Sequence, residues 1–528
     1  MSDKRIQSTM GDLEQKWNDL CDWIVHGGGK VHPALALRPI SSADHRGIFA
    51  ETDISQGELL IELPRHLALD GSSRPESYEV ESKERQASPW LRCLTSYFIA
   101  QKQLQNGAIA SGGTVSHACY LKTLPSSYET VSISWTKEEI ESFLSGTSSQ
   151  GIGDIGADWH MNFELVRGRY LGQVRPYLVY CSVLTQEVDD VESEIREFLH
   201  ASQCLSTRCF HLQQTQSTAS PLETESSSSY TGPYLLPLID LLNHSTYPES
   251  RCTTLESNGA SFIMKAERPI SAGEEILHSY GNDLTISQFL QTFGFIEEKL
   301  LHDLTLPPSA SKSTLAYFPS PVIVSKHLIL DACWQVVESG YPERLGQAME
   351  QAEMEDEIWA VKVDKKRGTQ NPLIPDSLLI DRTNLLSDEL VTLACLPFLP
   401  GCACREAGRS LLGREILEDY FLGNLVAKSL LQAIQMRLEA YKPIVWNDSQ
   451  KSNDAEFLKE LLDSSGKKSD HGRRASYGLA LRIDEKATLE ALRHEVLQII
   501  VFLEESSTDQ EMMNDDDSPT KRTKIDTL

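Results

Sequence analysis

The spacing of apolar positions divides the chain into stretches with different periods. Residues 11–26 place large apolar side chains three or four positions apart, which predicts an amphipathic helix. These side chains are Leu13, Trp17, Leu20, Trp23 and Ile24. Between Gly47 and Leu69, and again between Leu235 and Ser279, short apolar runs alternate with turn residues, which is typical of strands. The strands of the second stretch are expected at 235–242, 261–266 and 275–279.

Two longer stretches carry the helical period instead. Residues 88–205 and residues 321–505 are mostly helical in pattern. The clearest helices are expected at 87–105, 137–145, 159–184, 390–396, 415–441 and 486–503. A chain of 528 residues is too long for one core, so two or three domains are expected. The pattern predicts an α+β protein, in which a strand-rich part interrupted by helices precedes a helical part.

Composition narrows the class of protein. The net charge is −27, so the chain is a poor candidate for binding nucleic acid; its acidity fits a basic protein partner or simple solubility. No stretch approaches eighteen apolar residues, and the first residues lack an apolar run, so neither a membrane span nor a secretory signal is expected. The 11 cysteines are scattered and odd in number, which favours free thiols in a reducing compartment.

Two short segments carry the candidate chemistry. An apolar run, 235–242, ends in Asn243-His244-Ser245, and Tyr280-Gly281 follows the strand-like run 275–277. A buried strand that ends in polar side chains delivers them to a defined place, and a tyrosine at a strand end can face a cavity. Taken alone, the Asn-His pair also fits a hydrogen-bonded polar pair in a core, and the tyrosine fits an ordinary buried phenol.

Together with further motifs in the same order, these segments resemble the SET-domain methyltransferases. The similarity is greatest to the branch of the plant Rubisco large-subunit methyltransferase and its animal and fungal relatives, which include fungal-type lysine methyltransferases of ribosomal proteins and elongation factors. The motifs that carry the resemblance are His45–Ala50, Tyr120–Pro125, Thr207–Arg208, Asn243–His244, Tyr280–Gly281 and Phe293–Phe295.

The resemblance implies an organisation of domains. A β-rich SET catalytic domain is expected at 20–300, split by a helical insertion at about 88–205 and carrying a mobile Ser/Thr-rich loop at 213–232. An all-α substrate-binding domain of the Rubisco-methyltransferase type would follow at 301–505, and a disordered tail at 506–528. Within this family the chain is threaded near the Asn-His strand, contrary to the general avoidance of knots.

The resemblance also implies the roles of particular residues. Tyr280 would be the catalytic residue, with its phenol oxygen bordering the channel through which the methyl group passes. S-adenosyl-L-methionine would be held by Gly47, Ile48, Phe49, Arg208, Asp240, Asn243 and His244. Phe210 and Phe295 would line the substrate channel. His244 would give backbone groups to the adenine and a side-chain hydrogen bond to the fold.

Methyl transfer to lysine requires a neutral amine. A free lysine has a pKa near 10.4, so only about one in a few thousand is neutral at pH 7. Desolvation in a narrow apolar channel and the adjacent sulfonium charge both favour the neutral form. Precise positioning then matters more than a strong base.

Alternatives remain open at this stage. The SET fold could serve as a catalytically inactive protein-binding module, or the acceptor could be histidine; an aromatic Phe210 favours the aliphatic stem of lysine. No metal is expected, because no cysteine lies between Cys252 and Cys333, and Cys395, Cys402 and Cys404 lack an evident fourth ligand. The expected partner is a protein that carries the target lysine, and the chain is expected to be a monomer in the cytoplasm, the nucleus or both.

Overall fold

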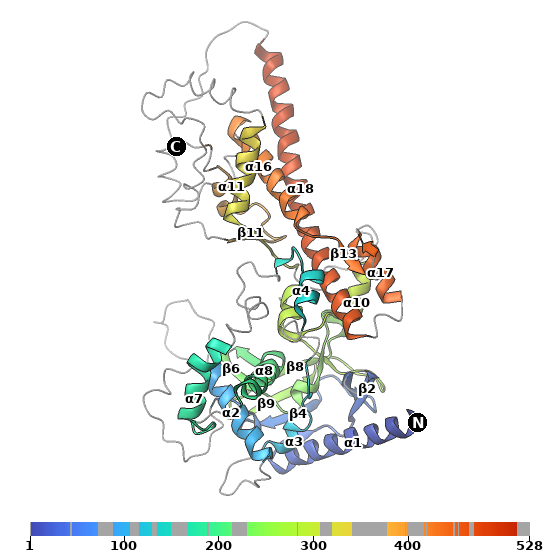
Figure 1. Ribbon diagram of the computed structural model, residues 1–528. Coiled ribbons are helices and arrows are strands. Elements are labelled where there is room, and N and C mark those ends of the chain that lie inside the picture. The colour runs from blue at the N-terminus through green and yellow to red at the C-terminus, as the bar shows by residue number, and fades with distance from the viewer. Residues whose placement is uncertain are drawn as a thin grey trace, which may run out of the picture.

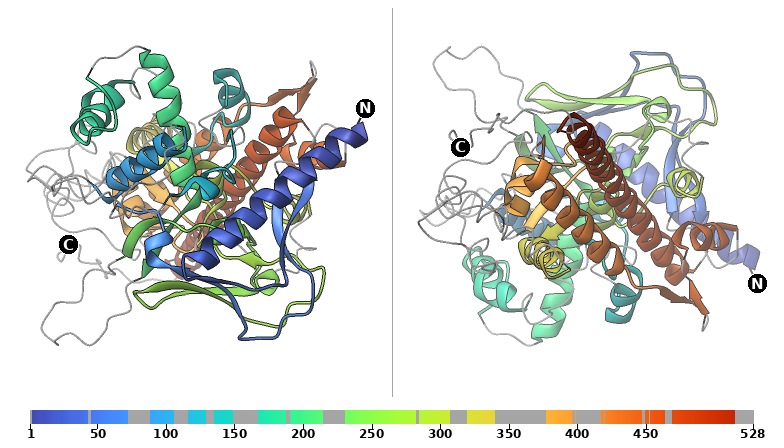
Figure 2. Two further views of the ribbon diagram at one scale, coloured as in Figure 1. Left: turned by 90° about the horizontal axis from the view of Figure 1, so that it is seen from below. Right: turned by 90° about the horizontal axis from the view of Figure 1, so that it is seen from above.

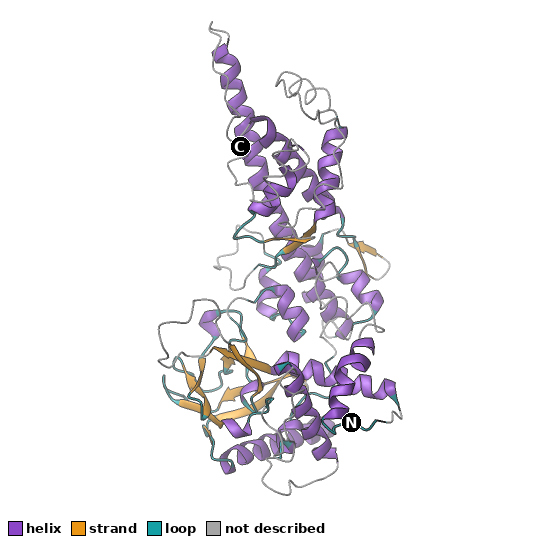
Figure 3. Cartoon of the chain, turned by 90° about the vertical axis from the view of Figure 1, so that its left-hand side faces the viewer, coloured by secondary structure: helices purple, strands orange, loops and turns teal. Residues whose placement is uncertain are grey.

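The computed structural model describes most of the chain. The described residues are 2–42, 45–71, 88–105, 116–128, 135–148, 167–186, 190–213, 230–281, 284–306, 319–339, 377–395, 398, 417–418, 420–446, 449–451, 453–463 and 469–514. Strands gather at one end of an elongated molecule, and helices make up the other end, hereafter the helical lobe (residues 319–514) (Figures 1 and 3).

The β-rich domain is built on a four-stranded antiparallel sheet with the order β1-β4-β9-β8. Its strands are β1 (Lys30–Val31), β4 (Leu59–Pro64), β8 (Thr253–Ser257) and β9 (Ser261–Ala266). Helix α1 (Ser2–His26) lies across this domain when it is seen from below (Figure 2). Leu20 and Ile24 of α1 are fully buried, as the helical spacing of its apolar residues predicts.

Three two-stranded sheets also lie in the described part of this domain. The antiparallel pairs are β2 (Leu35–Ser42) with β3 (His45–Ala50) and β5 (Cys209–Gln213) with β6 (Tyr230–Leu235). The parallel pair is β7 (Asn243–His244) with β10 (Leu277–His278). In the sequence, the hairpin of β8 and β9 lies between β7 and β10. The pairing of β7 with β10 therefore joins segments that are more than thirty residues apart.

The prediction of a strand at 235–242 is wrong. Strand β6 ends at Leu235, and the chain then turns through a 3₁₀ helix, η6 (Ile239–Leu241), before β7 begins. Pro237 has no N–H to donate, and Leu238 adopts a positive φ of 73°, so the run cannot continue as an extended strand. The apolar run is nevertheless buried, since both Leu236 and Leu238 are inaccessible to solvent.

Helices lie in the stretch where the helical insertion is expected. They are α2 (Pro89–Gln105), α3 (Ala118–Leu121), α4 (Lys137–Phe143), the π-helical turn η5 (Tyr170–Val174), α7 (Arg175–Tyr180) and α8 (Val191–Arg208). Helices α2 and α8 share one hydrophobic core with the sheets, in which Leu94, Phe198 and Leu205 are buried together with residues of β4 and β6.

The helical lobe follows the β-rich domain through α9 (Ile286–Gln288), the π-helical turn η8 (Phe289–Phe293) and α10 (Glu298–Asp303). Its helices are α11 (Lys326–Glu338), α14 (Asp388–Cys395), α16 (Tyr420–Glu439), α17 (Asp454–Asp463) and α18 (Asp470–Asn514). Two short antiparallel pairs that the sequence pattern did not predict lie among them. These are β11 (Val322–Ser325) with β12 (Ser377–Ile380) and β13 (Ile444–Trp446) with β14 (Ser449–Lys451).

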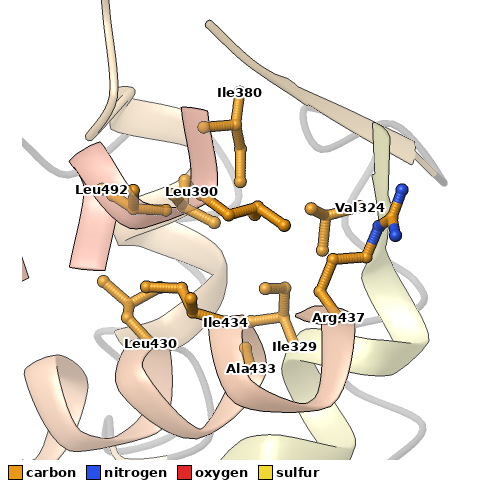
Figure 4. Close-up of a pocket in the computed structure, with 10 residues that line it drawn as sticks. Val324, Ile329, Ile380, Leu390, Leu430, Ala433, Ile434, Arg437 and Leu492 are labelled. Atoms are coloured by element: carbon orange, nitrogen blue, oxygen red, sulfur yellow. The ribbon is translucent and has the colours of Figure 1, made fainter. Parts of the chain in front are cut away.

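The core of the helical lobe is densely packed. Figure 4 shows its cavity, which is lined by apolar side chains such as Val324, Ile329 and Leu430 and by the stem of Arg437. The cavity has a volume of about 10 Å³, which is room for one water molecule. An organic ligand therefore does not fit there.

Helix α4 belongs to the helical lobe by its packing, although the sequence places it inside the insertion. Phe143 and Ile140 are buried with Leu458 of α17 and with Leu479 of α18. Gly478 of α18 makes this contact possible, because a Cβ at that position would come within 2.7 Å of the Phe143 side chain. Figure 1 shows α4 beside α18, between the two ends of the molecule.

Several predictions about the ends and loops of the chain lie partly or wholly outside the described residues. This is the case for most of the Ser/Thr-rich loop at 213–232, and for Cys402 and Cys404. Helix α18 continues to Asn514, past the predicted start of the tail at 506. Within the described ranges, no helix is long and apolar enough to cross a membrane, and no cluster of three metal-ligating side chains occurs.

Candidate active site

The parallel pairing of β7 with β10 brings the two motif segments together. Asn243 lies opposite Leu277, and His244 lies opposite His278. The backbone N–H of Ser245 donates to the carbonyl oxygen of His278 over 3.1 Å, which extends the ladder by one bond. Tyr280 follows directly, so the tyrosine and the Asn-His pair occupy the same end of this short sheet.

The side-chain amide of Asn243 is held by two acceptors. Its Nδ2 donates to the carbonyl oxygen of Arg46 over 2.9 Å and to Oε1 of Glu275 over 2.8 Å. The Arg46 carbonyl comes from β3, which runs beside Glu275 because the N–H of Ile276 donates to the carbonyl oxygen of Ile48 over 2.7 Å. The structure therefore brings Gly47 of β3 beside Asn243, while Ile48 and Phe49 pair with Ile276 and Glu275. That these three residues hold the cofactor stays a prediction.

His244 is a structural hydrogen-bond acceptor. Its Nδ1 accepts from the backbone N–H of Tyr280 over 3.0 Å, and its Nε2 lies 3.5 Å from Oγ1 of Thr246. Burial, together with the positive charge of Arg251, lowers the pKa of His244 to about 3. The expected side-chain hydrogen bond of His244 to the fold is confirmed, and its ring is neutral at pH 7.

The phenol of Tyr280 is oriented by one hydrogen bond. Its hydroxyl donates to the carbonyl oxygen of Leu242 over 2.9 Å. Burial raises the pKa of Tyr280 to about 12, so the phenol stays protonated and does not serve as a strong base. Since the proton points at Leu242, the lone pairs of the oxygen are left to accept contacts from a substrate.

An aromatic cluster surrounds this tyrosine, and its members are His244, Tyr280, Phe289, Phe293 and Phe295. The rings of Tyr280 and Phe293 lie 4.9 Å apart between centroids, and those of Tyr280 and Phe295 lie 6.3 Å apart, edge to face. Phe289 packs 4.7 Å from the ring of His244. The cluster gives the site an apolar wall next to the phenol. Phe295, which is predicted to line the substrate channel, lies in this wall.

Phe210 lies beside His278 of β10. Its ring centroid is 6.1 Å from that of His278, which is two residues before Tyr280. Phe210 is half-buried at the start of β5. The structure thus brings it to the site but not into the aromatic cluster.

Arg208 and Asp240 pair with each other. Nη1 of Arg208 donates to the backbone oxygen of Asp240 over 2.9 Å and lies 3.4 Å from Oδ2 of its carboxylate. That Oδ2 also accepts from the hydroxyl of Tyr120 over 2.8 Å. Burial raises the pKa of Asp240, against the opposing effect of Arg208. Within the described chain, Nε of Arg208 and Oδ1 of Asp240 are buried without a hydrogen-bond partner. Buried polar atoms are usually hydrogen-bonded, so an ion pair that served the fold alone would be expected to satisfy both atoms.

Sequence reasoning missed three contributors to this site. Glu275 was named only as part of a strand, although it anchors Asn243. Glu297 accepts from Oγ of Ser245 over 3.0 Å and from N–H of Thr246 over 2.7 Å, so it ties the strand β7 to the chain after Phe295. Phe289 completes the aromatic cluster. The sequence offered one signal for each of the last two: Glu297 lies two residues after the Phe-Gly-Phe motif, and Phe289 lies four residues before it.

Acid should destabilise this site through its neutral histidines. Burial lowers the pKa of His278 to about 4 from 6.5, and that of His244 falls to about 3. Between pH 6.5 and about 4 the unfolded chain binds more protons than the folded one. The free energy of unfolding should therefore fall by up to about 1.4 kcal/mol per pH unit for each histidine as the pH is lowered.

The measurement is urea unfolding across this pH range, for the wild type and for His278→Gln. As the pH is lowered, the free energy of unfolding of the variant should fall less steeply than that of the wild type. The difference in slope is the contribution of His278. An identical slope in both proteins would mean that His278 takes up its proton as freely in the folded state as in the unfolded one.

The class of protein follows from this geometry and from comparison with known domains. The family model of the SET domain matches residues 45–281, the stretch that carries β3, β7, β10 and Tyr280. The fold is therefore a SET-domain fold with mixed helices and strands, followed by a helical region, as predicted.

Among curated proteins, the chain is similar to two N-lysine methyltransferases named setd6. The protein from Salmo salar is 23% identical over 301 residues, which cover 56% of this chain and 60% of that protein. The protein from Xenopus laevis is 23% identical over 284 residues, which cover 52% of this chain and 56% of that protein. The match thus spans less than two thirds of the length of these relatives.

Among solved structures, the chain is similar to Rubisco LSMT along nearly its whole length. Rubisco LSMT bound to AdoMet gives a TM-score of 0.57 at 15% identity, with 93% of each chain covered. The SET domain of LSMT bound to lysine and AdoHcy gives 0.56 at 15% identity, with 93% of this chain and 92% of that chain covered. At this level of identity the similarity is one of fold, and it includes the helical lobe.

Proposed function

We propose that the chain is an S-adenosyl-L-methionine-dependent protein-lysine N-methyltransferase of the Rubisco-methyltransferase-like branch. The observation that carries the proposal is the convergence of Asn243, His244 and Tyr280 beside Gly47 in a SET-domain fold. The two curated relatives are N-lysine methyltransferases, and similar solved structures hold AdoMet or lysine, which supports the same activity here.

The residues of the site fit the proposed cofactor. Within the described residues, Oδ1 of Asn243 accepts no hydrogen bond, so it is available for the ammonium of the amino-acid end. Nε of Arg208, buried without a partner, is a donor that suits a carboxylate. When bound, the cofactor supplies an activated methyl group on a sulfonium.

The chain itself contributes the preparation of the amine. The apolar wall formed by Phe293 and Phe295 disfavours the charged ammonium, because burial in low dielectric costs a charged group its hydration. The oxygen of Tyr280, whose proton is committed to Leu242, accepts a contact from the amine or from the polarised methyl group. Positioning along the line of attack then lowers the barrier without a strong base.

The substrate is proposed to be a non-histone protein, with a ribosomal protein or a translation factor as the leading candidate. The helical lobe would present it to the site, in the manner implied by the resemblance to the Rubisco-methyltransferase branch. The acidic balance of the chain, −27 overall, favours a basic target. Such targets are found in the cytoplasm and the nucleus, which are the proposed locations, and the protein is proposed to act as a monomer.

The test is calorimetric titration of the purified protein with S-adenosyl-L-methionine, for the wild type and for Asn243→Ala. The wild type should bind in the micromolar range. Asn243→Ala should bind about 10- to 100-fold more weakly, because a hydrogen bond to a charged group is worth about 1.5–3 kcal/mol. The melting temperature of each protein establishes that it is folded. A folded wild type that binds no cofactor would refute the proposal and favour a protein-binding module.

A screen with labelled methyl groups in cell extract then identifies the acceptor. Hydrolysis of the labelled protein should release methylated lysine. Methylated histidine would overturn the choice of acceptor, and a Phe210 variant assayed on both acceptors would then show whether this aromatic sets the preference.

A further inference from the structure

We propose that Glu275 is a positioning residue that fixes the amide of Asn243 for cofactor binding. This inference rests on the proposed function and deepens it. The family resemblance assigns no role to Glu275, and the role proposed for it rests on its contacts with Asn243 and Gly47.

The first contact is the hydrogen bond between the two side chains. Nδ2 of Asn243 donates to Oε1 of Glu275 over 2.8 Å, and its second hydrogen goes to the carbonyl oxygen of Arg46 over 2.9 Å. An amide nitrogen has two hydrogens, so both are committed. The plane and the direction of the amide are thereby set, and only Oδ1 remains to accept from a ligand.

The second contact is with the backbone of β3. A Cβ placed on Gly47 would come within 2.2 Å of Oε1 of Glu275 and within 3.0 Å of Nδ2 of Asn243. The carboxylate therefore lies directly against the glycine, and no other residue type leaves this space. The role of Gly47 is thus to admit the carboxylate of Glu275 as well as to bring backbone near the cofactor.

The backbone of Glu275 is as well placed as its side chain. Glu275 forms an antiparallel β-bridge with Phe49 of β3. The backbone on either side is also bonded to β3: the N–H of Ala50 donates to the carbonyl oxygen of Glu274 over 2.9 Å, and the N–H of Ile276 donates to that of Ile48 over 2.7 Å. Burial raises the pKa of Glu275, and its hydrogen bond with Asn243 opposes that rise. A carboxylate that is partly desolvated and rigidly based holds its partner more firmly than a surface side chain does.

Two physical roles for this carboxylate can be separated. If Glu275 acts by orienting Asn243, its loss should matter only while Asn243 is present. If it acts by attracting the positive sulfonium, its loss should matter with or without Asn243, and it should matter less for S-adenosylhomocysteine, which lacks that charge.

The experiment is calorimetric titration of Glu275→Ala, Glu275→Gln, Asn243→Ala and the double variant Glu275→Ala/Asn243→Ala. Each is titrated with S-adenosyl-L-methionine and with S-adenosylhomocysteine. Glu256→Ala is the matched control, because Glu256 is an exposed glutamate of the same domain that pairs with Lys265. Melting temperatures show which variants fold.

Positioning predicts a distinctive set of results. Glu275→Ala should weaken both ligands about 10-fold, and Glu275→Gln, which keeps an acceptor for Nδ2, should stay within about threefold of the wild type. The double variant should bind no more weakly than Asn243→Ala alone, since contacting residues that act as one unit are not additive. Glu256→Ala should leave both affinities unchanged.

Other outcomes overturn the inference. Additive losses in the double variant, or a loss confined to S-adenosyl-L-methionine, would assign Glu275 to direct attraction of the sulfonium. Wild-type affinity in a folded Glu275→Ala would remove it from the site altogether. Failure of the wild type to bind either ligand would instead refute the proposed function.

Discussion

Replacing Tyr280 by Phe should abolish most methyl transfer while leaving cofactor binding almost intact. The expected loss of turnover is at least about 100-fold, the usual effect of removing one oriented group that contacts the reacting atoms. The physical reason lies in the hydroxyl: it donates its proton to the carbonyl oxygen of Leu242, so under the proposed function its lone pairs accept a contact from the amine or the methyl group. The phenyl ring of the variant still packs against Phe293 and Phe295, so the aromatic cluster should keep its shape.

The measurement combines two readouts on the same preparations. Transfer of tritiated methyl groups to proteins of a cell extract reports turnover, and calorimetric titration with S-adenosyl-L-methionine reports cofactor affinity, which should change by less than about threefold. Tyr170→Phe is the matched control, because it removes a tyrosine hydroxyl that bonds Glu194 outside the site. Equal turnover in the wild type and Tyr280→Phe would exclude the hydroxyl from the reaction.

The largest expected loss of stability follows from Arg482→Ala. Arg482 is 1% exposed, and its Nε donates to Oδ2 of Asp454 over 3.1 Å. The remaining nitrogens donate to the carbonyl oxygens of Ser145 over 3.1 Å and of Lys442 over 2.7 Å. Removal of this side chain takes a donor from the two carbonyls and from the buried carboxylate of Asp454, so the free energy of unfolding should fall by about 3–5 kcal/mol.

Chemical unfolding followed by circular dichroism measures this effect. Asp454 keeps its contact with Lys486 at 2.7 Å, which limits the cost of losing the arginine. The matched control is Arg493→Ala on the same helix, because the Arg493 side chain is 44% exposed and pairs with Glu490 three residues away. Its expected cost is below about 0.5 kcal/mol. Comparable losses in the two variants would contradict the buried network as a source of stability.

The parts of the site that sequence reasoning predicted are those written in contiguous motifs. Asn243-His244 and Tyr280-Gly281 each occupy a few consecutive residues, so their residue types identify them without knowledge of the fold. The α+β class and most helix positions were predicted for a similar reason, because a helix such as α2 or α16 repeats its apolar spacing over many residues.

What sequence reasoning missed depends on contacts between distant segments. The Asn243–Glu275 bond joins residues 32 positions apart, and nothing in the run Glu274-Glu275 distinguishes the carboxylate that bonds Asn243 from its neighbour, which pairs with Arg268. The pairing of Arg208 with Asp240, which are also 32 positions apart, cannot be predicted from their places in the sequence either. The strand expected at 235–242 failed because a positive φ at Leu238 is invisible to an analysis of hydrophobicity.

The packing of residues 135–148 in the helical lobe has a consequence for how the chain acquires its structure. The N–H of Ser148 reaches the carboxylate of Glu485 across 337 positions of sequence. A chain that emerges from the ribosome in order cannot close this contact until almost all of it has been made. Until then, the apolar side chains of this segment, Trp135, Ile140 and Phe143, stay exposed to solvent. A chain that terminates early would leave them accessible to chaperones and proteases.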